Sequence, residues 1–153
     1  MNLGQSSDHR SIKILLVEDE TSIAELYVHV LEKNGMTVKA ISDPVQVVQV
    51  LESEAFDVML LDLMMPKVNG LELMKSPPVI QAKEKMKIIV LTNLEQESII
   101  KEAYALGASG YVVKAKLAPE QLITVIKDTI NPSVPGEKKP VDGWFNKLFK
   151  PKS

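Results

Sequence analysis

The stretch Asp57-Val58-Met59-Leu60-Leu61-Asp62-Leu63-Met64-Met65-Pro66 decides the fold of this chain. Val58 to Leu61, with Leu63, have the apolar composition of a strand that is buried on both faces. Asp62 places a lone carboxylate near the end of that strand, where an unpaired charge is costly to bury. Pro66 prevents the strand from continuing. An acid at this position either caps the following loop or lies where open α/β sheets bind their ligands.

Apolar runs on both sides of this stretch have the composition of further strands, and they cover residues 12–17, 36–41, 87–92 and 110–114. Segments with helical spacing of apolar residues separate them, at 21–34, 43–51, 71–75, 95–106 and 119–130. Strands that are apolar nearly throughout indicate a parallel sheet covered by helices on each face. The sequence therefore predicts an α/β protein, a (βα)5 doubly wound five-stranded parallel sheet in a flavodoxin-like three-layer sandwich.

Local signals set the ends of several predicted helices. Thr21 or Ser22 can cap the first helix, and Asn34-Gly35 can close it. Pro77-Pro78 should cut short or kink the helix at 71–75. In the helix at 43–51, Asp43 is the expected cap. The residues expected to face inward are Val45, Val48 and Leu51, with Val47 as a further candidate.

The composition narrows the class of protein. The chain has 153 residues, of which 45% are hydrophobic and 25% charged, which suits one globular domain. It has no cysteine, which excludes disulfides and thiolate metal sites. Its net charge of -2 gives no reason to expect DNA binding. Without a signal-peptide core or an apolar run of about 18 residues, we expect a cytoplasmic protein.

The composition changes after Ile130, and this suggests a division of the chain. We expect a disordered N-terminus at 1–11, one domain at 12–130, a proline-containing linker at 131–142 and a short basic-aromatic tail at 143–153. The tail carries Trp144, Phe145, Leu148 and Phe149. Three interpretations of it stay open, namely a disordered end, a peptide that docks on a partner protein, and a weak attachment to an anionic membrane.

Polar residues stand where the predicted strands end, at Glu18, Asp19, Glu20, Asp62, Thr92 and Lys114. The carboxyl ends of parallel strands meet at one edge of the sheet, so these side chains should converge there. Clustered carboxylates favour a hard divalent cation such as Mg²⁺. A hydroxyl and an ammonium group beside them suit an anionic phosphoryl group, and a carboxylate can itself attack phosphorus.

This pattern resembles the receiver domain of two-component response regulators. The resemblance covers residues 12–130, and it is closest to stand-alone receivers of the chemotaxis-regulator type. It rests on motifs in the expected order, which are Leu16-Val17-Glu18-Asp19-Glu20, Leu61-Asp62-Leu63-Met64-Met65-Pro66 with Gly70, Val90-Leu91-Thr92, and Gly107-Ala108-Ser109-Gly110-Tyr111-Val112-Val113-Lys114.

The resemblance implies a phosphoacceptor site. Asp62 would accept a phosphoryl group from a sensor histidine kinase or a phosphotransfer protein. Asp19 would bind Mg²⁺ directly and Glu18 through water, and the backbone carbonyl of Met64 would complete the protein ligands together with Asp62. Such a protein is a phosphorelay component of signal transduction and not an enzyme.

The resemblance also implies a switch. Lys114 would pair with Asp62 or its phosphoryl group, and Thr92 would bind a phosphoryl oxygen. Tyr111 would turn inward when Thr92 moves, and so alter an output face that binds an unknown downstream protein. That face would be built from the helix at 95–106, the strand at 110–114 and the helix at 119–130.

Each of these residues alone has a structural explanation. Acids such as Glu18 and Asp19 often occupy the first turn of a helix, and a lysine such as Lys114 commonly ends a strand at the surface. Thr92 could be an ordinary strand residue and Tyr111 an ordinary core residue whose hydroxyl reaches water. The coincidence of all of them at one edge favours the functional interpretation.

The sequence departs from the family pattern at three positions. Ala115 follows Lys114, where many receivers carry a proline that helps to set the loop, so the geometry around Lys114 is less constrained. Met64 and Leu94 occupy the positions that flank the route of the hydrolytic water in this family. Both are apolar and cannot orient water, which predicts slow self-dephosphorylation.

Three other functions fit the residues less well. A phosphorylation-independent pseudo-receiver adaptor, whose C-terminal tail docks a partner or membrane, would usually lack the acceptor, the acid pair or the lysine. A phosphatase or phosphotransferase with Asp62 as nucleophile would need a second acid where Met64 stands. A nucleotide or flavin binder would need a glycine-rich loop where Glu18-Asp19-Glu20 stands.

Overall fold

A computed structural model describes residues 10–132 of the chain. Residues 1–9 and 133–153 lie outside this part, so the expected disordered N-terminus at 1–11, the linker at 131–142 and the tail at 143–153 stay predictions. Two residues of the first segment contact the domain. The Arg10 guanidinium binds both carboxylate oxygens of Asp57, at 2.9 and 3.1 Å, and the Ser11 hydroxyl donates to the Gly35 carbonyl at 2.8 Å.

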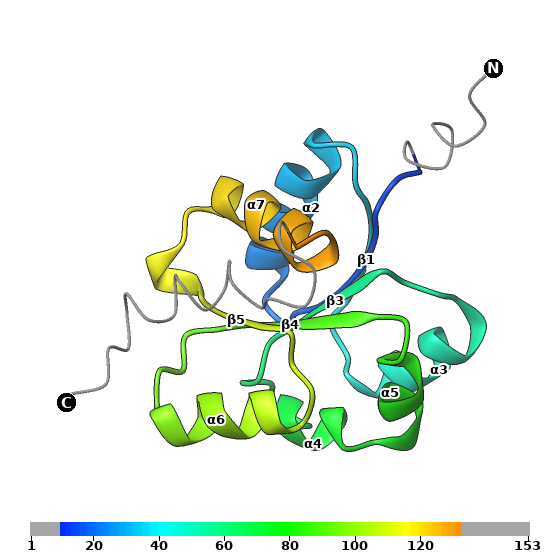
Figure 1. The fold of residues 1–153 in the computed structure, drawn as a ribbon, viewed down its shortest axis with the longest axis vertical. Coiled ribbons are helices and arrows are strands. Elements are labelled where there is room, and N and C mark those ends of the chain that lie inside the picture. Colours follow the sequence, from blue (N-terminus) through cyan, green and yellow to red (C-terminus); the bar gives the residue numbers. More distant parts are fainter. Residues whose placement is uncertain (1–9, 133–153) are drawn as a thin grey trace.

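The described residues contain one five-stranded parallel sheet (Figure 1). Its strands are β1 (Lys13–Val17), β2 (Thr37–Ile41), β3 (Val58–Leu61), β4 (Lys87–Thr92) and β5 (Gly110–Val113). Their order across the sheet is β2-β1-β3-β4-β5, so β3 is central. The register sets Val17 beside Leu61 and Leu61 beside Val90, and the central strands therefore end at nearly the same level.

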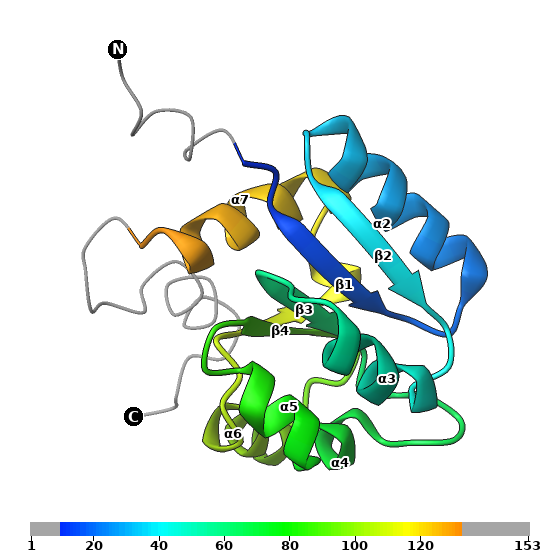
Figure 2. The same ribbon diagram turned by 90° about the vertical axis from the view of Figure 1, so that its right-hand side faces the viewer.

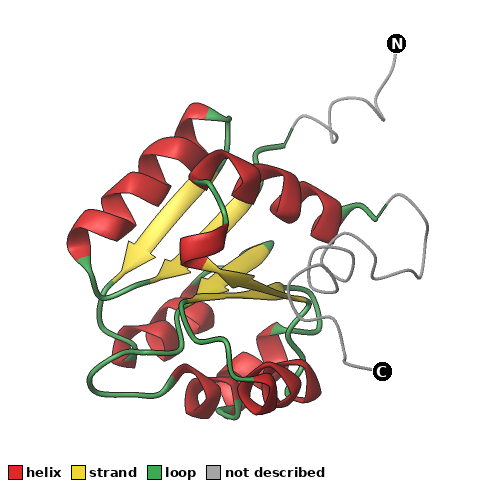
Figure 3. Cartoon of the chain, turned by 90° about the vertical axis from the view of Figure 1, so that its left-hand side faces the viewer, coloured by secondary structure: helices red, strands yellow, loops and turns green. Residues whose placement is uncertain are grey.

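Helices cover both faces of the sheet (Figures 1 and 2). One layer holds α2 (Thr21–Lys33) and α7 (Pro119–Ile130). The other holds α3 (Val45–Ser53), α4 (Gly70–Met74), α5 (Pro77–Ala82) and α6 (Glu97–Ala105). A single 3₁₀ turn, η1 (Lys114–Lys116), follows β5. Figure 3 shows the strands enclosed between the two helical layers, which confirms the predicted flavodoxin-like sandwich.

Two apolar cores form because successive strand residues point to opposite faces. In β3, Met59 and Leu61 pack toward α3 to α6, whereas Val58 and Leu60 pack toward α2 and α7. The strands are thus apolar at nearly every position, as predicted. None of the helices among residues 10–132 is long and apolar enough to cross a membrane.

The prolines at 77 and 78 do more than end a helix. They stop α4, as predicted, but they also occupy the first turn of a second short helix, α5, which the sequence analysis missed. Proline is well suited to a first turn, because the N–H it lacks would have no partner there. The helix at 21–33 begins at Thr21 with Glu20 in the capping position, so the predicted caps at Thr21 and Ser22 were wrong.

The inward face of α3 differs from the prediction at Val45, whereas the further candidate Val47 does face inward. Val47 is fully buried, whereas Val45 is 59% exposed. The Asp43 carboxylate accepts the Val45 N–H at 3.0 Å, but the capping position is occupied by Pro44, one residue later than predicted. The helix begins only at Val45, so its first residue faces solvent and the buried stripe is displaced toward Val47, Val50 and Leu51.

Gly70 lets two segments of backbone approach each other next to Asp62. A Cβ at this position would lie 2.6 Å from the Asp62 main-chain oxygen and 2.8 Å from the Leu63 Cα. The Gly70 N–H donates to the Leu63 carbonyl at 3.1 Å. These neighbours are backbone atoms, so they cannot move aside as a flexible side chain would.

Gly70→Ala should therefore lower the free energy of unfolding by about 1–3 kcal/mol, because the added methyl group must displace backbone. Urea denaturation measures this loss, and the amide chemical shifts of residues 61–64 should change in the native state. Gly35→Ala is the control. Gly35 has a φ of +83° and open space around it, so the substitution costs backbone strain and should leave those shifts unchanged. Unchanged shifts in Gly70→Ala would contradict the proposed close approach.

Candidate functional site

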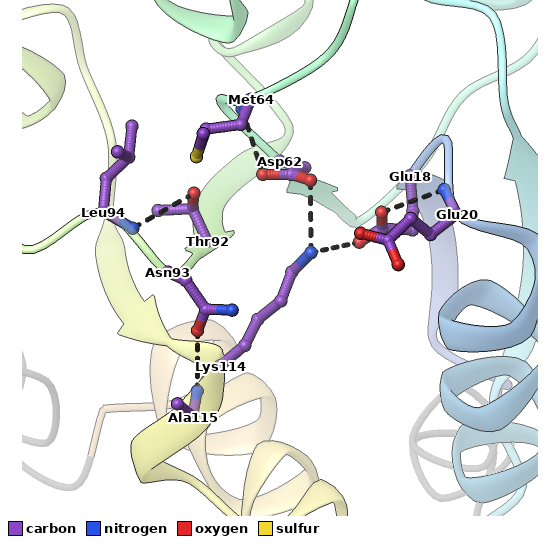
Figure 4. A network of polar contacts seen from close by, with 9 residues as sticks. All are labelled: Glu18, Glu20, Asp62, Met64, Thr92, Asn93, Leu94, Lys114 and Ala115. Carbon is purple, nitrogen blue, oxygen red and sulfur yellow. Dashed lines mark hydrogen bonds and ion pairs between the residues drawn. The ribbon is translucent and has the colours of Figure 1, made fainter.

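The predicted residues do converge at the carboxyl edge of the sheet (Figure 4). The backbone continues the sheet pattern for one residue beyond the strands, since the Glu18 N–H donates to the Ile41 carbonyl at 3.0 Å and the Asp62 N–H donates to the Val17 carbonyl at 3.1 Å. These bonds hold both acids at fixed positions on neighbouring strands. Glu18 is 2% exposed and Asp62 is 5% exposed, so neither is an ordinary surface acid.

Lys114 joins the two acids. Its ammonium group donates to Glu18 and, at 3.1 Å, to Oδ2 of Asp62, as Figure 4 shows. Lys114 stands at the end of β5, two strands away from β3 and three from β1, and its long side chain spans that distance. One cation therefore compensates two buried carboxylates, and the trio keeps a net negative charge.

The pKa values of Glu18 and Lys114 reflect the competition between burial and charge. Burial raises the pKa of Glu18 above its usual value, because the loss of hydration outweighs the hydrogen bonds from Lys114 and from the Glu20 N–H. Burial alone would lower the pKa of Lys114. The hydrogen bond to Glu18 and the charge of Asp62 outweigh that effect, so the pKa of Lys114 is raised and the ammonium form is favoured.

Asp62 is oriented from both sides. Its Oδ2 accepts a hydrogen bond from the Lys114 ammonium group, and its Oδ1 accepts the backbone N–H of Met64 at 3.1 Å. The Met64 side chain is 58% exposed. With Leu94, it lines an open groove of 460 Å³ that also includes Asp19. The carboxylate is thus fixed in direction beside a largely apolar opening.

The acids form a group with the chemistry of a cation site. Carboxylate oxygens of Glu18, Asp19 and Asp62 lie within 4.8 Å of one another. Oxygen-only donors at this spacing fit a hard divalent ion such as Mg²⁺. Asp19 is only half-buried, whereas Glu18 is already engaged by Lys114 and by the Glu20 N–H at 3.2 Å. This cluster can hold a metal ion, with Asp19 as its most accessible acid.

Thr92 and Tyr111 lie on the other side of Asp62. Thr92 is fully buried at the end of β4, and its hydroxyl lies 3.5 Å from the Leu94 backbone nitrogen. The Tyr111 ring is fully buried, and its hydroxyl donates to the Leu94 carbonyl at 2.8 Å. Tyr111 therefore faces inward in this structure. Its hydroxyl bonds to backbone and does not reach water, and burial raises its pKa.

Asn93 is a further residue of the site, which the sequence did not predict. Its side-chain oxygen accepts the backbone N–H of Ala115 at 2.8 Å. A proline at 115 has no N–H and could not make this bond. The departure from the family pattern, which we expected to loosen the surroundings of Lys114, therefore comes with a hydrogen bond that holds the same loop. Because Ala115 has a backbone N–H where a proline has none, that N–H needs an acceptor. This was the only signal in the sequence that pointed to a nearby acceptor such as Asn93.

Comparisons with known proteins agree with this geometry. The family model described as response regulator receiver domain matches residues 14–127. The alkaline phosphatase synthesis transcriptional regulatory protein PhoP of Bacillus subtilis is 36% identical over 102 residues, which are 67% of this chain and 42% of PhoP. The phosphate regulon transcriptional regulatory protein PhoB of Rhizobium meliloti is 34% identical over 113 residues, which are 74% of this chain and 50% of PhoB. The chain spans about half the length of these curated relatives.

Solved structures share the fold over nearly their whole length. The chemotaxis response regulator CheY4 of Vibrio cholerae superimposes with a TM-score of 0.71 at 28% identity, covering 78% of this chain and 99% of CheY4. A CheY-like receiver domain protein of Methanospirillum hungatei gives a TM-score of 0.70 at 26% identity, covering 79% of this chain and 94% of that one.

Lys114→Met should leave Glu18 and Asp62 uncompensated, and lower the free energy of unfolding by about 3 kcal/mol at pH 7.5 without divalent cations. The pKa of Glu18 is raised in the native state, so as the pH falls the native protein binds a proton before the unfolded chain does. The loss should therefore shrink between pH 7.5 and about 5. Urea denaturation in EDTA at both pH values measures it.

Lys116→Met provides the matched control for this substitution. Lys116 pairs with Glu95 at 2.6 Å on the surface, where such a pair contributes at most about 1 kcal/mol. This variant should show a small loss without the same pH trend. If Lys114→Met lost equal stability at both pH values, Lys114 would not be acting as the partner of an ionised Glu18.

Proposed function

The chain belongs to the response regulator receiver domain family, and on that basis we propose that Asp62 is its phosphoacceptor. A receiver domain is a phosphoacceptor regulatory module of two-component signalling and not a classical enzyme. One observation carries the assignment to Asp62. It is the buried acid whose two oxygens are held separately, by Lys114 and by the Met64 N–H, inside the cluster with Glu18 and Asp19.

The donor would be a phosphohistidine on a sensor histidine kinase or a phosphotransfer protein. An Asp62 oxygen attacks phosphorus, the P–N bond breaks, and the electron pair leaves with the imidazole, which is then protonated. The product on Asp62 is an acyl phosphate. Lys114 and the Thr92 hydroxyl then bind phosphoryl oxygens, Lys114 exchanging one carboxylate for the more highly charged phosphoryl group.

The metal site belongs to the same proposal. Asp19, Asp62 and the Met64 carbonyl would hold Mg²⁺, and Glu18 would contact it through water. When bound, the ion supplies positive charge that offsets the negative charge gathering on the phosphoryl group. The oxygen-only character of the cluster and its spacing support this choice of metal.

The output would pass through Thr92 and Tyr111 to the face formed by α6, β5 and α7. Tyr111 bonds to Leu94, two residues beyond Thr92, so any movement of that loop acts on the tyrosine. Charged residues on this face are already paired, Lys101 with Glu97 at 2.9 Å and Lys116 with Glu95 at 2.6 Å. A downstream protein would be recognised there through protein contact. Cytoplasmic localisation and the absence of DNA binding stay predictions.

Incubation with acetyl phosphate and Mg²⁺ tests the acceptor. Intact mass spectrometry should show a single phosphoryl adduct, absent in Asp62→Asn and strongly reduced by EDTA. Asp43→Asn, outside the acid cluster, is the control and should keep the adduct, because asparagine also caps helices well. If neither acetyl phosphate nor a histidine kinase phosphorylates the chain, the phosphorylation-independent adaptor becomes the better account.

The apolar opening beside Asp62 predicts a long-lived phosphoryl group. Met64 and Leu94 offer no hydrogen bond to an attacking water, so decay after removal of the donor should be slow. Met64→Asn should speed decay several-fold by supplying a group that can orient water. Met64→Leu keeps the opening apolar and should leave the rate unchanged. A wild-type decay as fast as that of Met64→Asn would refute this explanation.

A further inference from the structure

A groove runs between α2 and the edge strand β2, away from the opening at Met64. Its volume is 420 Å³. Apolar side chains of Ala24, Val28 and Ile41 contribute to its lining, and Ala24 and Ile41 are buried there. Glu25 and Glu32 stand exposed along it, and Glu18 of the acid cluster also lines it. Figure 2 shows α2 alongside β2 at this edge of the sheet.

We propose that the tail of the same chain, residues 143–153, docks in this groove between α2 and β2. The tail lies outside the described residues, and its composition is known from the sequence. It holds Trp144, Phe145, Leu148 and Phe149. These apolar side chains can bury surface against the apolar residues that line the groove. Aromatic residues contribute strongly to such binding.

Charge complementarity favours this groove. The tail carries Lys147, Lys150 and Lys152 and no acidic residue. The groove presents the carboxylates of Glu25 and Glu32 and no lysine or arginine among its lining residues. Opposite potentials steer a tethered segment to its site and disfavour other positions.

The chain is long enough to reach. The tail is joined to α7 through residues 131–142, which can extend over about 40 Å. A domain of this size has a radius of gyration of roughly 14 Å, so the groove lies within range. α7 contacts α2, and Leu122 and Ile126 of α7 belong to the same apolar core as Tyr27 and Leu31 of α2. The tether therefore starts on the same side of the sheet as α2.

A second groove is a weaker candidate for the tail. It lies between the end of α3 and α5, has a volume of 520 Å³, and includes Leu51, Phe56 and Met86. Lys85 also lines it, and the Lys13 ammonium lies 5.1 Å from the centre of the Phe56 ring. Its lining also includes the acids Glu52, Glu54 and Glu84, so charge alone does not separate the two grooves. This groove lies in the helical layer opposite α7, where the tether begins, whereas the groove between α2 and β2 lies on the same face of the sheet as α7.

A docked tail would occupy the surface of α2 that lines the groove. The groove includes both Glu18 and exposed residues of α2, so a docked tail would occupy surface adjacent to the acid cluster. Another protein that approaches α2 from this side would first have to displace the tail. The inference does not depend on phosphorylation of Asp62, and the two can fail separately.

Trp144 provides a direct probe, because it is the only tryptophan in the chain. The experiment measures the Trp144 emission maximum and its quenching by acrylamide in the full-length protein. Two groove variants are compared with wild type. Glu25→Lys/Glu32→Lys reverses the charge of the groove, and Ala40→Arg places a bulky cation in it from the exposed position 40. Glu52→Lys/Glu84→Lys is the matched control, with the same charge change at the second groove.

Wild type and the control should show blue-shifted emission and a quenching constant roughly two-fold below that of both groove variants, as a tethered segment that is mostly bound would give. Circular dichroism checks that every variant is folded. Equal quenching in wild type and groove variants would overturn the proposal. Loss of Trp144 protection in the control variant instead would also overturn it. Protection that disappears on dilution would indicate a second copy of the chain, and protection that appears only with anionic vesicles would indicate a membrane; either result would overturn the proposal.

Discussion

The ammonium group of Lys114 is the element on which the rest of this site depends. It lies between two carboxylates that the protein has taken out of water, Glu18 and Asp62. Burying two carboxylates without a nearby cation would cost several kcal/mol of stability, about 3–5 for a broken buried pair. Lys114 neutralises only part of the negative charge, because one ammonium group lies beside two carboxylates. A divalent ion and an incoming phosphoryl group are the two partners that such a set can accommodate together.

The sheet is what allows that contact to form. Parallel strands of nearly equal length end together, so residues far apart in the sequence meet at one edge. The alternation of strand side chains between two apolar cores leaves no freedom for β3 to slip, since a shift of one residue would turn Met59 and Leu61 toward the wrong helices. The position of Asp62 is therefore fixed by apolar packing on both sides, although its function is polar.

The sequence was sufficient to predict a parallel sheet between two helical layers and the convergence of the acids, hydroxyl and lysine, because both follow from composition and from the geometry of parallel sheets. The second helix at Pro77 was missed because proline signals either the end or the start of a helix. Val45 was placed inward because periodicity does not fix where a helix begins. The inward position of Tyr111 and the contact between Asn93 and Ala115 depend on how two loops lie in space, which a linear pattern does not encode.

That last contact has a mechanical meaning. Asn93 is the immediate neighbour of Thr92, and Ala115 is the immediate neighbour of Lys114. The 2.8 Å hydrogen bond between Asn93 and Ala115 therefore connects the segment that holds Thr92 to the segment that holds Lys114. A movement of Thr92 toward Asp62 would therefore also act on the backbone next to Lys114, through the hydrogen bond of the Ala115 N–H.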